Sequence, residues 1–105
     1  MRPEDAKSLI KNVLGSPITF DGHFGKCFEH LKETQQQELL AWIQDCKARK
    51  TNPLQSKTNR ELIGFVRRIG SNLRAILTKK KRGYFLVLFL DKHKYYETEM
   101  QKLGF

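Results

Sequence analysis

The stretch from residue 63 to residue 90 decides the fold, and it reads Ile63-Gly-Phe-Val-Arg-Arg-Ile69, Gly70-Ser-Asn72, Leu73-Arg-Ala-Ile-Leu-Thr78, Lys79-Lys-Lys-Arg-Gly83 and Tyr84-Phe-Leu-Val-Leu-Phe-Leu90. Three apolar segments alternate with two short polar ones, which is the pattern of an antiparallel meander. Apolar side chains fall on both faces of the third segment. We therefore expect residues 84–90 to form a central strand that is covered on both sides.

Upstream of the meander, apolar residues recur at helical spacing. Residues 3–14 begin with a proline and two acids and end before a glycine, as helices prefer. A short first strand at 18–20 should follow, and then a helix that Asp21 caps. The most regular helix is expected over residues 35–49, where Thr34 and Gln37 match a capping box.

Two further segments flank the meander. Residues 50–60 are polar and contain a proline, which predicts an exposed loop, and residues 95–103 are expected to form a short terminal helix. The order of all these elements predicts one α+β domain over residues 1–105, in which helices pack on one face of a small, mainly antiparallel sheet. Residues 1–15 would form an N-terminal helical extension of this domain.

The two cysteines and the hydropathy bear on the compartment. Cys27 and Cys46 fall at core-type helical positions without metal-ligand spacing, so we expect reduced packing residues rather than a disulfide. No apolar run reaches the ~20 residues of a membrane span, and no signal peptide is recognisable. These features predict a cytoplasmic protein that does not enter the membrane.

Charge is distributed unevenly along the chain. The 105 residues include 20 Lys and Arg against 11 Asp and Glu, a formal net charge of +9. Residues 1–46 carry a net charge of −2 and residues 47–105 a net charge of +11. A near-neutral half joined to a strongly cationic half favours a polyanionic partner, either a nucleic acid or an acidic protein. A basic surface without a ligand is the alternative.

Polar, titratable residues follow the last strand directly, in the segment Asp91-Lys-His-Lys-Tyr-Tyr96. RNA can be cut without a metal when its 2′-hydroxyl attacks the adjacent phosphate, which requires proton transfer and cations that stabilise the charge on phosphorus. His93 is the candidate for proton transfer, because an unperturbed imidazole titrates near neutral pH. Arg67 and Arg74 are the candidate phosphate clamps, and Arg74 should project away from the face of Leu73, Ala75 and Leu77.

We expect the two guanidinium groups and the His93 imidazole to converge on one concave wall. Tyr95 or Tyr96 could stack a base or orient a proton there. Other basic residues should help to capture RNA: Arg68, Lys79, Lys80, Lys81, Arg82, Lys92 and Lys94. The ordinary alternatives are a solvated histidine at a helix start, arginines on a sheet surface and a solvated basic turn. No metal site and no cofactor motif is recognised, so neither is expected.

With its elements in this order, the chain resembles the superfamily of bacterial toxins named after RelE and ParE. The resemblance covers residues 18–100 and rests on the helix pair 21–31 and 34–49, the pattern Arg67-Arg68…Gly70-Ser-Asn-Leu-Arg74, and the apolar strand that ends in Lys-His-Lys-Tyr-Tyr. Similarity to the RelE and HigB branch implies the toxin of a type II toxin–antitoxin pair that cleaves mRNA on the ribosome and is held inactive by a cognate antitoxin. By position, the catalytic residues would be Arg67, Arg74, His93 and Tyr95 or Tyr96.

Two features depart from the nucleases of this superfamily: the extra N-terminal helix and the His-Lys-Tyr-Tyr cluster, which matches none of their C-terminal signatures. ParE-like relatives use the same scaffold against DNA gyrase and lack the catalytic cluster. A non-catalytic inhibitor that binds gyrase or another protein is therefore an alternative to the nuclease. A plain RNA-binding module is another.

Overall fold

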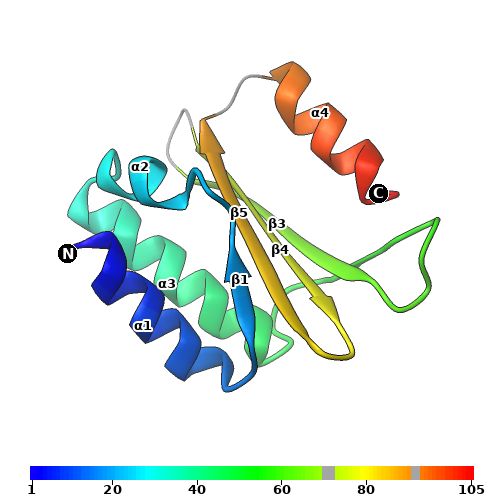
Figure 1. Cartoon of the computed structure of the whole chain (residues 1–105), viewed down its shortest axis with the longest axis horizontal. Helices are drawn as coiled ribbons and strands as arrows, with labels where there is room; N and C mark the ends of the chain where they lie inside the picture. Colours follow the sequence, from blue (N-terminus) through cyan, green and yellow to red (C-terminus); the bar gives the residue numbers. More distant parts are fainter. Residues whose placement is uncertain (70–72, 91–92) are drawn as a thin grey trace.

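A computed structural model describes the chain at residues 1–69, 73–90 and 93–105, and for residues 88–90, 93–96 and 99 it describes the backbone alone. The chain folds into helices and a mixed sheet (Figure 1), which confirms the predicted α+β class. In chain order the elements are α1 (Pro3–Leu14), β1 (Ile18–Phe20), α2 (Phe24–Glu29), α3 (Glu33–Lys47), β2 (Leu54–Gln55), β3 (Ile63–Ile69), β4 (Leu73–Lys80), β5 (Gly83–Leu90) and α4 (His93–Lys102).

The strands form one sheet in the order β1-β5-β4-β3-β2. Strands β3, β4 and β5 are the predicted antiparallel meander, in a register that aligns Val66 with Ile76 and Ile76 with Val87. Strand β1 pairs with β5 in parallel, which the long intervening chain permits. This pairing makes β5 an interior strand, as expected from its apolar residues.

The helices α1, α2 and α3 cover one face of the sheet (Figure 1), which we call the helix face. Their inward side chains and every second strand residue form the main core, whose fully buried members include Ile10, Phe24, Phe28, Leu39, Ile43, Phe65, Leu77 and Leu86. Helix α1 is built into this core rather than appended to it. Its residues Ala6, Ile10 and Leu14 are fully buried, and Lys47 of α3 donates a 2.7 Å hydrogen bond to the Leu14 carbonyl.

Helix α4 lies against the opposite face of the sheet (Figure 1), which we call the α4 face. A small second cluster joins Ile76 and Val87 to Met100 and Leu103 there. The prediction of helices on one face therefore describes α1, α2 and α3 but not this terminal helix. Because α4 contacts only part of its face, Phe85 on β5 remains 38% exposed. The expectation that residues 84–90 are covered on both sides is wrong at that residue.

Residues 50–60 are mostly exposed, as predicted, but they also contain the edge strand β2 and the buried Ser56. Ser56 Oγ donates a 2.6 Å hydrogen bond to the Leu103 carbonyl, and the Lys57 N–H donates a 2.7 Å bond to the Gly104 carbonyl. Gly104 has a φ of +78°, and a Cβ on it would collide with the hydroxyls of Ser56 and Thr58. These contacts tie the loop after β2 to the chain that follows α4.

The two cysteines lie in the main core and are reduced, as predicted. Cys27 and Cys46 are both buried, on α2 and α3. Burial raises the pKa of the Cys46 thiol from 9.0 to about 12. The Cys46 thiol therefore stays protonated and packs as a small side chain at neutral pH.

Candidate nucleic-acid interface

Arg67 and Arg74 project from opposite faces of the sheet. Arg67 is aligned with Ala75, a fully buried member of the main core, so its side chain leaves the sheet on the helix face. There its Nε and Nη2 donate hydrogen bonds of 3.1 and 2.9 Å to one carboxylate oxygen of Glu38 on α3. Arg67 is aligned with Ala75, the residue after Arg74, so Arg67 and Arg74 lie on opposite faces of the sheet. The predicted convergence of these two arginines is therefore wrong.

Arg68 takes the place that was expected for Arg67. It is aligned directly with Arg74 on the neighbouring strand, so both side chains leave the sheet on the α4 face. Arg74 points away from the face of Leu73, Ala75 and Leu77, as predicted, and it is half-buried, whereas Arg68 is exposed. The register therefore places two guanidinium groups next to each other on one face of the sheet. Both arginines also interact with other groups of the protein.

The cluster at the end of β5 is described only in part. Lys92 lies outside the described residues, and the backbone of His93, Lys94, Tyr95 and Tyr96 forms the first turn of α4. His93 follows the last residue of β5 by three positions, so its Cα lies within about 11 Å of that strand end. The strand end is paired with Leu73, next to Arg74. The chain connection alone thus keeps the start of α4 close to the Arg68–Arg74 pair.

The side chains of the basic turn lie in different surroundings, although Lys80, Lys81 and Arg82 line one shallow pocket together with Glu61. The Nζ of Lys79 lies 5.3 Å from the centre of the Tyr84 ring on the helix face, and Lys81 forms a 3.4 Å ion pair with Glu61. Lys80 and Arg82 instead line a pocket on the α4 face. Of the four predicted RNA-binding residues in this turn, these two are the ones that share a face with Arg68 and Arg74.

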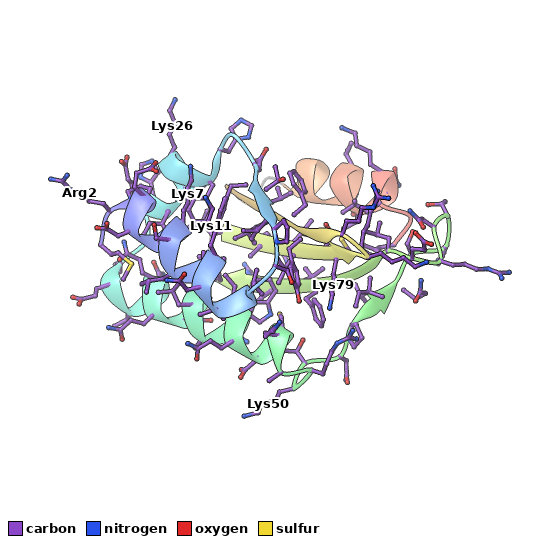
Figure 2. All side chains as sticks on the ribbon, turned by 60° about the horizontal axis from the view of Figure 1, so that its bottom comes forward. Arg2, Lys7, Lys11, Lys26, Lys50 and Lys79 are labelled. Carbon is purple, nitrogen blue, oxygen red and sulfur yellow. The ribbon has the colours of Figure 1, made fainter. Side chains whose placement is uncertain are left out.

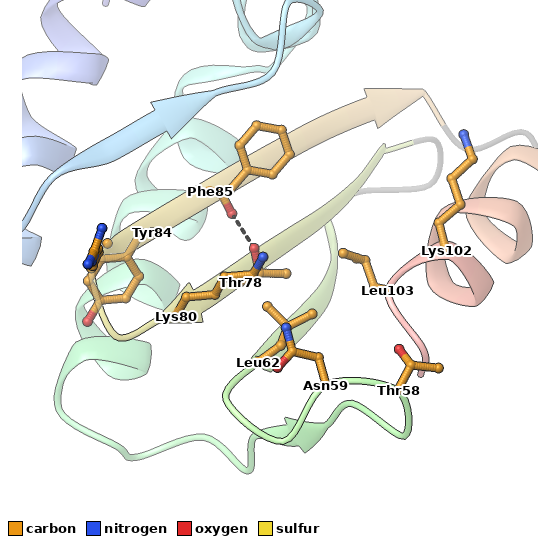
Figure 3. A pocket seen from close by; sticks show the side chains of 11 residues that line it. Thr58, Asn59, Leu62, Thr78, Lys80, Tyr84, Phe85, Lys102 and Leu103 are labelled. Carbon is orange, nitrogen blue, oxygen red and sulfur yellow. Dashed lines mark hydrogen bonds between the residues drawn. The ribbon is translucent and has the colours of Figure 1, made fainter.

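This pocket, the hairpin pocket, has a volume of about 470 Å³. Figure 3 shows that its walls come from the β4–β5 hairpin, the loop before β3 and the end of α4. Sequence reasoning missed several of its residues: Thr58, Asn59, Thr78, Phe85 and Lys102. The period-2 alternation of β5 already places Phe85 on the second face of its strand. For Thr58, Asn59 and Lys102 the sequence holds no comparable signal, because only the docking of α4 brings them to the hairpin.

Basic side chains also occur on the helix layer, where acids are mixed among them. Figure 2 shows Arg2, Lys7, Lys11 and Lys26 at or beside α1 and α2. Lys7, for example, lies 3.7 Å from Glu4, and its Nζ lies 5.6 Å from the centre of the Phe20 ring. The other side of the sheet combines the arginine pair, the pocket and further basic residues with the acids Glu61 and Glu97.

Two classes of feature are missing from the part of the chain that the structure describes. It holds no group of three or more His, Cys, Asp and Glu side chains that could ligate a metal ion. None of its helices has the length and apolar character that crossing a bilayer requires.

No protein-family model, no curated protein and no solved structure matches this chain. The resemblance to the RelE and ParE toxins therefore stays a prediction from the sequence.

Proposed function

We propose that this protein is the toxin of a type II toxin–antitoxin pair, that it cleaves mRNA without a metal, and that it holds the RNA on the α4 face. The observation that carries the proposal is the Arg68–Arg74 pair. The pair lies on the face of the sheet opposite α1, α2 and α3, beside the strand end from which α4 begins. Such an activity would place the protein with ribosomes in the cytoplasm.

The arginine pair suits the chemistry of RNA cleavage by an internal hydroxyl. As the 2′-hydroxyl attacks, negative charge grows on the non-bridging phosphate oxygens, and two neighbouring guanidinium groups can hold and stabilise them through charge-assisted hydrogen bonds. In this proposal His93 takes the proton of the 2′-hydroxyl as the new O–P bond forms and a 2′,3′-cyclic phosphate results. The bond from phosphorus to the 5′-oxygen of the next nucleotide breaks, and a water molecule supplies the proton to that leaving oxygen. Tyr95 or Tyr96 stacks a neighbouring base. Arg67 takes no part, because it is bound to Glu38 on the helix face.

The proposal also implies a regulating partner. An antitoxin that inhibits this protein must cover or compete for the α4 face, where the positive charge gathers. An acidic segment would complement that face by charge. The antitoxin is thus expected to lose affinity when Arg68 or Arg74 is replaced, and to be indifferent to the loss of Arg67.

Adjacent arginines on one strand provide a matched test. Wild type, Arg67→Ala, Arg68→Ala, Arg74→Ala and His93→Ala would be compared on ribosomes programmed with a defined mRNA, in the presence of magnesium for ribosome integrity, and on free RNA in EDTA. Mapping of new RNA 5′ ends measures cleavage. Loss of a charge-stabilising donor typically lowers a rate ~10²–10³-fold and loss of an acid–base group ~10²–10⁴-fold. We expect such losses for Arg68, Arg74 and His93 and near wild-type cleavage for Arg67.

Two results would overturn the proposal. One is the absence of new 5′ ends for the wild type under every condition while its expression still arrests growth. In that case a supercoiling assay with DNA gyrase would decide whether the protein is a ParE-like inhibitor. The other is equal activity of all four variants, which would remove the α4 face from the mechanism.

A further inference from the structure

The hairpin pocket lies on the α4 face at the opposite end of β4 from the arginine pair. Arg74 and Lys80 are six residues apart on this strand, and their even separation puts both on the same face. The separation corresponds to about 20 Å along the sheet. The proposed cleavage residues therefore do not use this pocket, and its composition requires a separate explanation.

The lining of the hairpin pocket matches the two parts of a nucleotide. Three basic residues from different elements line it: Lys80 from β4, Arg82 from the hairpin turn and Lys102 from α4. Phe85, a large aromatic residue that is 38% exposed, also lines it. An exposed aromatic side chain beside cations is the combination with which proteins bind single-stranded nucleic acid, since the ring stacks on a base and the cations hold the phosphate.

The polar wall of the hairpin pocket is held in place before any ligand arrives. The buried Ser56 Oγ accepts hydrogen bonds from the N–H groups of Thr58 and Asn59, at 3.3 and 3.2 Å, while it donates to the Leu103 carbonyl. On the opposite wall, the Thr78 hydroxyl donates a 3.3 Å bond to the Phe85 carbonyl. A wall that is already ordered spares a ligand part of the entropy cost of binding.

We infer that the hairpin pocket is a second nucleotide-binding subsite, in which Phe85 stacks a base of the bound RNA strand and Lys80 and Arg82 hold its phosphates. The inference rests on the proposed function in that the strand is the RNA held by Arg68 and Arg74. The strand then runs along the α4 face from the arginine pair to the hairpin. Contacts at the hairpin add affinity without touching the bond that is cut.

Equilibrium binding of fluorescent single-stranded RNA tests the subsite. Probes of about 4 and about 16 nucleotides bracket the usual footprints of single-strand binding modules. For the longer probe, Phe85→Ala should weaken binding roughly 5- to 150-fold, the range that the loss of one stacked base corresponds to. Phe85→Tyr retains the ring and should bind like the wild type. Lys80→Ala/Arg82→Ala should reduce the slope of log K against log salt by about 1.4, which is two phosphate contacts.

Lys26→Ala on α2 is the control for general charge, because this exposed lysine lies on the helix layer (Figure 2). It should leave the affinity for the longer probe within about twofold of wild type. Circular dichroism of every variant checks that the fold is retained. Competition by a nucleoside monophosphate separates a free nucleotide from a strand, and we expect the monophosphate to bind far more weakly than the longer probe.

The inference is overturned if Phe85→Ala and Lys80→Ala/Arg82→Ala both bind the longer probe as the wild type does. It is also overturned if a monophosphate binds as tightly as the strand, because the ligand would then be a free nucleotide. Failure of the proposed function looks different. If the wild type never cuts RNA but Phe85→Ala and Lys80→Ala/Arg82→Ala weaken binding, the subsite is supported and the nuclease is rejected. If the wild type cuts RNA and these variants bind as tightly as it does, only the subsite is rejected.

Discussion

The helix face and the α4 face of the sheet are built from the same strands but differ in burial and charge. On the helix face, alternate residues such as Phe65 and Leu77 are fully buried under three helices. On the α4 face, the residues between them form a small apolar cluster around Ile76, with the arginine pair at one end and the hairpin pocket at the other. A strand with a period of two can thus supply a dry core and a charged surface at once.

Neighbouring residues of β4 provide the largest expected contrast, because Leu77 belongs to the main core and Ile76 to the smaller cluster, and both are fully buried. Truncating a buried aliphatic side chain to alanine lowers the free energy of unfolding of a protein by ~2–5 kcal/mol. We expect about 4–5 kcal/mol for Leu77→Ala and about 2–3 kcal/mol for Ile76→Ala, because α4 can move to close its cavity. Urea denaturation measures both. Equal losses would show that α4 packs as rigidly as the three-helix layer.

The pH dependence of the free energy of unfolding tests whether water is excluded from the helix face. Because the Cys46 pKa rises from 9.0 to about 12 on folding, the unfolded chain ionises first. The protonated Cys46 thiol therefore contributes fully to the free energy of unfolding below pH 9.0, and this contribution is lost as the pH rises towards about 12. At one pH unit above the unfolded pKa the loss is roughly 1.4 kcal/mol. Cys46→Ala should show a shallower decline in unfolding free energy over this range, and an unchanged slope would contradict a water-free site.

Gly64 on β3 tests how the C-terminal chain seals the α4 face. A Cβ on this residue would occupy the place of the Phe105 ring. Over-packing costs ~1–3 kcal/mol, and we expect about 1 kcal/mol for Gly64→Ala because the half-buried Phe105 side chain can be displaced. Urea denaturation measures the loss. In a Phe105→Ala background the same substitution should cost almost nothing, and an equal cost in both backgrounds would place the strain in the strand itself.

The Arg67–Glu38 ion pair should give the smallest effect. Its side chains are 46% and 36% exposed, so solvent screens their attraction. We expect Glu38→Gln to lower the unfolding free energy by about 0.2–1 kcal/mol and to leave RNA affinity unchanged. Thermal denaturation and the RNA-binding assay measure the two quantities. A clear change in RNA affinity would show that Arg67 reaches the bound strand and that the two faces are less separate than described.

Much of the fold could be predicted from local pattern. The limits of β3 match the prediction, and β4 and β5 are longer by only two residues and one residue. Helix α1 spans the predicted residues because Pro3 opens it and Gly15, with a φ of +63°, ends it. Strand β2 was missed since two residues carry no detectable period. The predicted side of the sheet was wrong for Arg67, whose side chain lies on the helix face.

Local sequence pattern predicted most of the elements, the alternation within each strand and the excess of positive charge in the second half, because these depend on neighbouring residues. It required Arg67 and Arg68 to point to opposite faces, but not which of them would join Arg74. Only the pairing register of β3 with β4 decided that, by aligning Arg68 with Arg74. Likewise, only the docking of α4 brought Lys102 and the loop after β2 to the hairpin. Register and docking depend on contacts between residues that are distant in the chain, and no local pattern encodes them.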